Sequence, residues 1–334
     1  MSGLFVQKHV EAVRAQGCDV RVIFSQGWRE TWRQWKTLQK SGWMPDIVQL
    51  NVIQKQGVLA LWLKKRYGIP YVIIEHWSGY LPENGSYMRQ GALKRRFCGL
   101  IASQASVLMP VSNCLKEAMQ QCGIRNERWE KVNNVVDEGF FNPTPTLPTR
   151  EGESTKGTKI ILHVSCFDER AKNVKGLLRA AKMLSEKRQD WQLVLVGDGI
   201  DYKETRAYES ELAFEEGLLR WTGELTPQEV AKEMHKADVF VLSSNYENAP
   251  VVLSESLACG TPIIATRAGG MPEMVSDECG VLVPPRDDQA LYEAMDFMLD
   301  HNSDYNPAVI RKHGEQYSPE RVGKHLKAIY ESVL

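Results

Sequence analysis

The stretch VFVLSSNYENAPVVLSESLACGTPIIATRAGGMPEMVSDECGVLVPP, Val239 to Pro285, decides the fold of this chain. Short apolar runs rich in β-branched residues alternate in it with a helix-like segment and glycine-containing turns, which is typical of parallel strands joined by helices. Glu247 falls in the first loop and Glu255 on the helix-like segment, with seven residues between them. Because ligands of such sheets bind at the carboxyl ends of the strands, we expect both glutamates at a ligand site.

The same alternation runs along most of the 334 residues, which are enough for two domains. Residues 142–158 interrupt it with three prolines, two glycines and no periodicity, as a linker would. We therefore predict an α/β protein of two doubly wound domains, 1–145 and 158–317, with a C-terminal helix at 318–334 that packs back on the first. The strands expected in the first domain include 19–24, 46–52, 71–76 and 131–137.

The beginning of the chain departs from the usual order of strand, glycine turn and helix. It starts at the turn, Ser2-Gly3, and continues into a helix. We expect the first strand of the N-terminal domain to be absent and the chain to start late relative to its natural relatives. The alternative is a sheet that tolerates one strand fewer.

Composition narrows the class of protein. The formal net charge of -1 gives no indication of nucleic-acid binding. The seven cysteines are scattered without a CxxC pair, which argues against a zinc site or a disulfide framework. No apolar run approaches the roughly 20 residues that span a bilayer, and the N-terminus lacks the pattern of a signal peptide. We expect a cytoplasmic protein.

The helix-like segment of the opening stretch has clear boundaries. Pro250 suits the first turn of a helix, and Gly260 suits its carboxyl-terminal cap. The start of this helix would present N–H groups from about residue 249 to 253, which favour a diphosphate or sugar hydroxyls. Glu247 could accept hydrogen bonds from a sugar, and Glu255 could hold both hydroxyls of a ribose. The alternative is that both are ordinary acids at a helix end.

These residues resemble the signature of the retaining glycosyltransferases of family 4, also called group 1. The resemblance covers nearly all the chain but is tight only in the second domain. The matching positions are Glu247, Glu255, Ala258, Gly260, Pro262, Ile263, Ile264, Ala265, Gly269, Gly270, Pro272 and Glu273.

The resemblance implies a GT-B fold, in which two Rossmann-like domains face each other across a cleft. It implies transfer of a sugar from a UDP- or GDP-sugar to a glycan or lipid-linked acceptor, with retention, no cofactor and no metal; no D-x-D motif is visible. Bacterial surface-polysaccharide biosynthesis is the expected setting. Glu247 would be catalytic, and the donor would be bound by Glu255 and by the helix start at Asn248, Ala249, Pro250, Val251 and Val252.

A second part of the donor site is expected at residues 163–178, where a strand leads into a helix. By resemblance, Lys172 is a catalytic cation that holds the departing diphosphate. Cys166 stands where the family usually has an arginine, and a thiol cannot form the forked contact of a guanidinium with phosphate. Arg170 is our candidate for supplying that charge from a shifted position.

Further site residues follow from the resemblance. Gly197, Asp198 and Gly199 form a turn at the end of a strand, where glycines permit close approach of the nucleotide base. Gly223 belongs to a second loop near the base.

On the acceptor side, His76 follows a strand and would act as a catalytic residue, and Gly3 would approach the donor phosphates. Lys94, Arg95 and Arg96, together with Arg89, form a basic patch. It indicates either a solvated helix face or contact with anionic lipid, or with a polyprenyl-diphosphate-linked acceptor, at the inner face of the plasma membrane.

Two other classes of function remain open on the sequence. The late start and Cys166 are compatible with a non-catalytic subunit that binds a nucleotide sugar. A different GT-B enzyme, such as a sugar-nucleotide epimerase, is the third reading.

Overall fold

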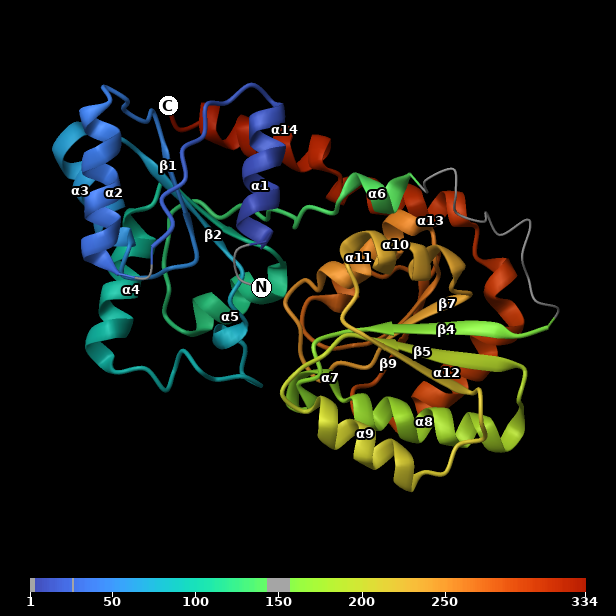
Figure 1. Cartoon of the computed structure of the whole chain (residues 1–334). Helices are drawn as coiled ribbons and strands as arrows, with labels where there is room; N and C mark the ends of the chain where they lie inside the picture. Colours follow the sequence, from blue (N-terminus) through green and yellow to red (C-terminus); the bar gives the residue numbers. More distant parts are fainter. Residues whose placement is uncertain (1–3, 26, 143–156) are drawn as a thin grey trace. The chain divides into compact units, whose positions relative to one another are not determined.

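The computed structural model describes residues 4–25, 27–142 and 157–334. The chain forms two compact units, unit 1 (Met1–Val135 with Pro319–Leu334) and unit 2 (Val136–Ser318). Each is an α/β unit built around a parallel sheet, as predicted (Figure 1). The first domain was expected to extend to 145, but Val136 and Phe140 are buried in the core of unit 2, so the boundary falls earlier.

The described sheet of unit 1 has three parallel strands in the order β1-β2-β3. Their bounds are β1 Val48–Asn51, β2 Tyr71–Glu75 and β3 Val107–Pro110. Every residue of β2 and β3 is buried, which explains their uninterrupted apolar sequences, whereas β1 is half-buried. The helices are α1 Leu4–Ala15, α2 Trp28–Lys40, α3 Gly57–Tyr67, α4 Ala92–Gln104, α5 Asn113–Gln121 and α14 Pro319–Glu331, with a 3₁₀ turn η1 at Ser78–Tyr80.

Two predicted strands of unit 1 are wrong. Residues 19–24 are not a strand in the structure, and their apolar side chains Val22 and Phe24 are exposed. A β-branched run becomes a strand only where a neighbour completes its hydrogen bonds, and no described strand pairs with this segment. Residues 131–137 are likewise irregular, although the amide of Val132 donates to the carbonyl of Pro110.

The C-terminal helix α14 packs against α1 within unit 1 (Figure 1). The contact is close at Gly323, where an added Cβ would lie 2.4 Å from the carbonyl oxygen of Ala12. The ammonium of Lys327 also donates to the carbonyl of Gln16 at 2.9 Å. The two ends of the chain sequence therefore meet in one unit.

Unit 2 contains a six-stranded parallel sheet in the order β6-β5-β4-β7-β8-β9. The strands are β4 Lys159–Val164, β5 Trp191–Val196, β6 Leu219–Gly223, β7 Val239–Leu242, β8 Ile263–Thr266 and β9 Gly280–Val283. The helices are α6 Glu138–Phe141, α7 Glu169–Lys172, α8 Val174–Lys187, α9 Tyr202–Glu211, α10 Pro227–Lys236, α11 Val251–Cys259, α12 Asp288–His301 and α13 Pro307–Gly314. Short 3₁₀ turns are η2 Met271–Glu273, η3 Asn302–Asp304 and η4 Glu315–Tyr317.

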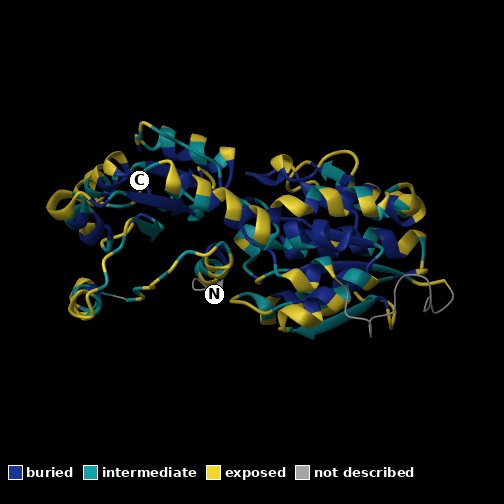
Figure 2. Cartoon of the chain, turned by 90° about the horizontal axis from the view of Figure 1, so that it is seen from above, coloured by how far each residue is buried: buried dark blue, intermediate teal, exposed yellow. Residues whose placement is uncertain are grey.

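Alternate residues of the central strands enter two separate cores, one on each face of this sheet. Ile161, Leu193 and Val241 pack with α8 and α12, whereas Leu162 and Phe240 pack with α10, α11 and α13. Figure 1 shows these helices on opposite faces of the sheet, and Figure 2 shows the strands as buried and the outer faces of the helices as exposed. The doubly wound arrangement fixes the carboxyl ends of the strands as one edge of unit 2.

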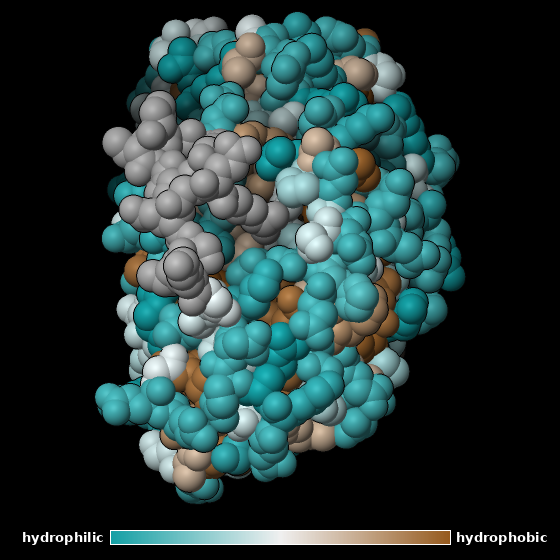
Figure 3. Space-filling view, turned by 90° about the vertical axis from the view of Figure 1, so that its right-hand side faces the viewer, coloured by the Kyte–Doolittle hydropathy of each residue, from teal (hydrophilic) through white to brown (hydrophobic). Residues whose placement is uncertain are grey.

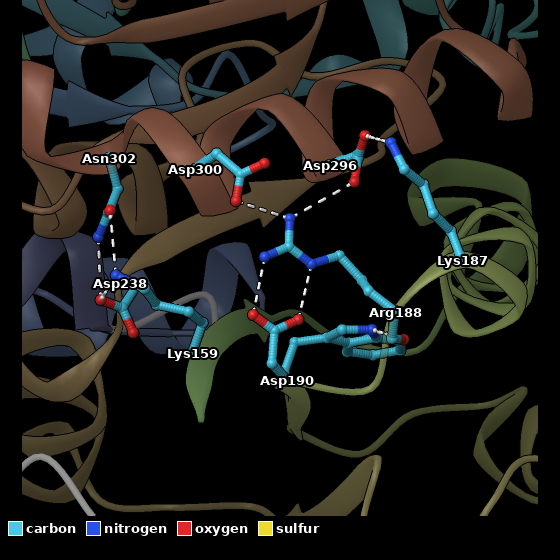
Figure 4. A network of polar contacts seen from close by, with 9 residues as sticks. Lys159, Lys187, Arg188, Asp190, Asp238, Asp296, Asp300 and Asn302 are labelled. Atoms are coloured by element: carbon cyan, nitrogen blue, oxygen red, sulfur yellow. Dashed lines mark hydrogen bonds and ion pairs between the residues drawn. The ribbon is translucent and has the colours of Figure 1, made fainter. Parts of the chain in front are cut away.

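A charged network ties α12 to the opposite, amino-terminal edge of the sheet (Figure 4). Arg188, 19% exposed at the side chain, makes two 2.7 Å hydrogen bonds to Asp190. It also contacts Asp300 at 2.8 Å and Asp296 at 3.5 Å, both on α12. The network lies away from the carboxyl ends of the strands and has a structural role.

The surface seen in Figure 3 is predominantly hydrophilic, with small separate hydrophobic patches. In the described part of the chain, no helix is both long enough and apolar enough to cross a membrane.

Candidate active site

The strand order of unit 2 makes the carboxyl ends of β4 and β7 the expected place for a ligand. The chain leaves β4 toward β5 on one side and leaves β7 toward β8 on the other, so these adjacent strands form the topological switch point of the sheet. The segments that follow them, 165–173 and 243–250, carry six of the predicted site residues: Arg170, Lys172, Glu247, Asn248, Ala249 and Pro250.

Lys172 and Glu247 meet at this switch point, although 75 positions separate them in the sequence. The Nζ atom of Lys172, at the end of α7, forms an ion pair with Oε1 of Glu247 in the loop after β7. Both side chains are only 14% exposed. The Oγ atom of Ser244 donates to the same carboxylate oxygen at 3.0 Å. The structure thus joins two residues that the sequence assigned separately to catalysis.

The charge state of Lys172 follows from this contact. Burial acts to lower its pKa, but the charge of Glu247 acts in the opposite direction, aided by Cys166, by the hydrogen bond to Glu247 and by Asp168. The net effect raises the pKa, so the ammonium keeps its proton at neutral pH. The pair thus places a charged ammonium and a carboxylate side by side at the carboxyl ends of β4 and β7.

Three polar residues that sequence reasoning missed hold this arrangement together. The Oγ atom of Ser243 donates to the carbonyls of Lys172 and Asn173, at 3.0 and 3.2 Å. The backbone and side-chain amides of Asn245 donate to the carbonyls of Ala171 and Arg170, at 2.7 and 3.0 Å. The run Ser243-Ser244-Asn245, directly after a buried strand, was the available signal.

The Gly269-Gly270 turn packs against the backbone of Glu247. The amide of Gly270 donates to the carbonyl of Glu247 at 3.0 Å. Gly269 has a left-handed φ of 55°, and a Cβ there would lie 1.7 Å from the same carbonyl oxygen. The turn therefore requires glycine because it packs on the backbone of Glu247.

The amino terminus of α11 lies next to Glu247 along the chain. The helix begins at Val251 with Pro250 as its N-cap, and it ends at Gly260, whose φ of 75° is the expected left-handed cap. Glu255 is half-buried, about one turn into the helix. The other predicted residues of this segment are buried Asn248 and Pro250 and half-buried Ala249, Val251 and Val252.

The predicted base-side turn packs against the loop after β4. Gly197, with a φ of 127°, would place a Cβ 1.9 Å from the carbonyl oxygen of Ser165, and its amide donates to the carbonyl of Gly223 at 2.8 Å. A Cβ on Gly199 would lie 2.5 Å from the amide nitrogen of Phe167, which donates to the carbonyl of Asp198 at 3.0 Å. The structure thus brings Gly197, Asp198, Gly199 and Gly223 together.

An aromatic cluster underlies this turn. The ring of Phe167 lies 5.4 Å from Tyr202 and 5.5 Å from Trp221, and the guanidinium of Arg206 covers Trp221 at 4.8 Å. These residues come from three different segments, so their meeting depends on the folded sheet and carries no local signal in the sequence.

The position of the expected arginine is occupied by an exposed thiol. Cys166 is exposed, and its carbonyl accepts from the amide of Asp168 at 2.8 Å. Arg170 is also exposed, and its backbone is held by Asn245. Arg286, in the loop after β9, donates from Nε to Oδ1 of Asn245 at 3.2 Å, and its left-handed φ of 61° is uncommon for a residue other than glycine. Arg286 is therefore a cation near α7 that sequence reasoning did not find.

The predicted acceptor-side histidine lies at the carboxyl end of β2 in unit 1. His76 stacks on Phe5 at 5.9 Å and lies 5.6 Å from the ring of His9. Burial, followed by the charge of His9, lowers the pKa of His76 to about 3, so its imidazole is neutral at physiological pH. Gly3 lies outside the described residues.

Comparison with known proteins identifies the family. The profile described as "Glycosyl transferases group 1" matches residues 149–315, and that of a "Glycosyl transferase 4-like domain" matches residues 11–134. The N-acetyl-alpha-D-glucosaminyl L-malate synthase of Bacillus anthracis is 30% identical over 239 residues, covering 69% of this chain and 61% of that protein. A Bacillus subtilis protein named for teichuronic acid biosynthesis, TuaC, is 24% identical over 88% of this chain and 72% of its own length.

The fold agrees with a solved structure. HepE of Anabaena, in complex with UDP and glucose, superposes with a TM-score of 0.73 at 21% identity, over 93% of this chain and 84% of that one. The chain therefore has the GT-B fold and belongs to group 1 of the glycosyltransferases.

Proposed function

We propose that the protein transfers a sugar from a UDP- or GDP-sugar to a glycan or lipid-linked acceptor, with retention of configuration, in bacterial surface-polysaccharide biosynthesis. The observation that carries the proposal is the half-buried ion pair of Lys172 and Glu247 beside the start of α11. The names of relatives such as TuaC support the setting.

Each residue of the pair has a distinct role in the proposed reaction. Glu247 accepts hydrogen bonds from hydroxyls of the donor sugar, and Glu255 accepts those of the ribose. Lys172 and the amino terminus of α11 stabilise the negative charge that develops on the leaving diphosphate, in the place where other transferases use a metal ion. Asn248, Ala249, Pro250, Val251 and Val252 shape the diphosphate site.

Retention requires the new bond to form on the face from which the diphosphate leaves. The bond between the anomeric carbon and the diphosphate oxygen breaks, and a bond from that carbon to the acceptor oxygen forms. The acceptor proton passes to an oxygen of the departing diphosphate. Neutral His76 orients the acceptor hydroxyl by a hydrogen bond.

The experiment that tests the function begins with binding of UDP and GDP by calorimetry, followed by a thermal-shift panel of nucleotide sugars. We expect one nucleotide to bind and Glu247→Gln to abolish turnover of its sugar, whereas Glu204→Gln, at a carboxylate 69% exposed on α9, leaves turnover unchanged. Binding of neither nucleotide would overturn the proposal. Binding without turnover would instead favour the non-catalytic subunit, which Cys166 in place of arginine suggests.

The proposed location is the cytoplasmic face of the plasma membrane, reached through α4. Leu93 and Leu100 of this helix are 83% and 52% exposed, and Lys94 and Arg96 are exposed beside them. Residues 84–116 contain no aspartate or glutamate, so every charged side chain in this region is positive.

Membrane contact is tested by sedimentation with vesicles of phosphatidylcholine, with and without phosphatidylserine. We expect binding only to the anionic vesicles. The double variant Lys94→Gln with Arg96→Gln should bind about thirtyfold more weakly, since each charge near the surface contributes about 1 kcal/mol. Equal binding of the two kinds of vesicle would contradict an anionic-lipid surface.

A further inference from the structure

Glu75, the last residue of β2, is a fully buried acid that the proposed reaction does not use. Its Oε1 atom accepts from the amides of His76 and Trp77, at 3.0 and 2.9 Å. Its Oε2 atom accepts from the amide of Ile53 at 2.9 Å, and the hydroxyl of Tyr80 also donates to the carboxylate. Among the described residues, no basic side chain pairs with it. A buried acid that is solvated only by three backbone amides and one hydroxyl, without a cation, carries a desolvation cost.

These hydrogen bonds join two loops at the carboxyl ends of neighbouring strands. Ile53 follows β1 directly after Val52, whose φ of 69° is a strained conformation for a β-branched residue. The amide of Val52 donates to the carbonyl of Ile74 at 2.8 Å, so the turn is held both there and at Glu75. The carboxylate therefore maintains a backbone conformation that a valine would not adopt by itself.

The second loop is equally constrained. The ring of Trp77 lies edge-on to Tyr80 at 5.3 Å, and a Cβ on Gly79 would lie 2.2 Å from that ring. Glu75 thus holds the backbone of Trp77 while Tyr80 and Gly79 hold its ring. His76 stands between these anchors, so its backbone position depends on the same carboxylate.

The surroundings leave Glu75 sensitive to pH near neutrality. Burial raises its pKa to about 7, and the amides of Ile53, Trp77 and His76 with the Tyr80 hydroxyl oppose the rise. Burial also raises the pKa values of the Tyr80 hydroxyl and the Cys98 thiol, which interact with Glu75, and lowers that of His76 to about 3. The titratable and charged groups around this cluster are His9, His76, Tyr80, Tyr87, Cys98, Cys122, Lys94 and Arg95.

We propose that Glu75 is a positioning residue of the acceptor half of the enzyme, whose carboxylate fixes the Val52–Ile53 turn and the His76–Trp77 loop in the geometry that receives the acceptor. The inference rests on the proposed function, since it takes the end of β2 as the place where the acceptor binds. An ionised carboxylate accepts hydrogen bonds from amides about twice as strongly as a neutral acceptor, so the anchoring is strongest when Glu75 is charged.

The first test is amide hydrogen exchange by mass spectrometry, corrected for the intrinsic rate, on peptides that cover Ile53 and Trp77. In the wild type we expect protection to fall about tenfold between about pH 8 and pH 6. In Glu75→Gln protection should be low at both values, while Glu83→Gln, an exposed acid of the same loop region, should behave as the wild type. Protection that is unchanged by pH in the wild type would overturn the proposal, even if the variant fails to fold.

The second test is the pH profile of transfer, measured with UDP or GDP binding in parallel. We expect kcat of the wild type to fall on the acid side near pH 7, and Glu75→Gln to remove this limb while leaving the nucleotide Kd unchanged. Equal acid limbs in both proteins would overturn the role of Glu75. A wild type that shows the expected exchange but transfers to no acceptor would overturn the proposed function, so the two failures are distinguishable.

Discussion

Replacing Lys172 by methionine tests the pair at the centre of the proposed site. The variant leaves the Glu247 carboxylate, 14% exposed, with the hydroxyl of Ser244 but without its cation. Breaking a buried pair by removing one partner costs about 3–5 kcal/mol, and the remaining solvent contact and the Ser244 hydrogen bond place the expected loss at about 3 kcal/mol. For a unit of this size, that corresponds to a fall in Tm of about 6–12 °C.

The assay is a double-mutant cycle with Glu247→Gln, followed by urea and thermal unfolding. Because methionine opposite glutamine leaves no unpaired charge, we expect the double variant to lose about 2 kcal/mol less than the sum of the single variants. The matched control is Lys175→Met, whose partner Glu204 is 69% exposed and whose loss should stay within about 0.5 kcal/mol. Additive losses for Lys172 and Glu247 would refute the reasoning.

The pH dependence of the pair has a defined sign. Because the pKa of Lys172 is raised in the folded state, its contribution to stability is fully present below the ordinary lysine pKa of 10.5. The contribution is lost as the pH rises through the folded value. Stability differences between wild type and variant should therefore be constant through neutral pH and shrink only in strong alkali.

Three further predictions concern stability. Gly269→Ala places a Cβ 1.7 Å from the Glu247 carbonyl and should lower the Tm and weaken nucleotide binding, whereas Gly217→Ala, also left-handed but in open space, should cost about 1 kcal/mol without affecting binding. Arg188→Met removes the cation shared by Asp190, Asp296 and Asp300, although Asp296 keeps its ion pair with Lys187. Because Asp190 and Asp300 are 48% and 60% exposed, the loss by urea unfolding should be about 1 kcal/mol, and less at high salt. Because the pKa of Glu75 is raised to about 7 in the folded state, the free energy of unfolding of the wild type should fall by up to about 3 kcal/mol as the pH rises from about 4.5 to about 7. Glu75→Gln should not show this fall. Equal pH slopes in the two proteins would contradict the titration of a buried Glu75.

The residues of the proposed donor site could be predicted from the sequence because their signals are local. The strand before Glu247, the helix that ends at Gly260 and the turn at Gly269 follow one another in one short stretch, and each obeys strong backbone rules. The contact between Lys172 and Glu247 was harder to predict from the sequence. Each was assigned a role, but their pairing requires β4 and β7 to be neighbours, which only the sheet order shows.

What the sequence could not predict depends on tertiary contacts. Residues 19–24 have the composition of a strand, but composition does not supply a partner. Glu75 looked like the polar end of a strand, and its four donors come from separate positions on two loops and η1. The hydrogen bonds that Ser243 and Asn245 donate to α7 likewise depend on backbone carbonyls about 70 positions earlier in the sequence.

The thiol at Cys166 is suited to site-specific chemical labelling. It is the one exposed side chain among the seven cysteines, all of which lie in the described part of the chain; the other six are buried or half-buried. A maleimide fluorophore would therefore attach first at the loop after β4, beside the ammonium of Lys172. A label in that position could report occupancy of the proposed donor site in real time, without a cysteine being introduced or the ligand being modified.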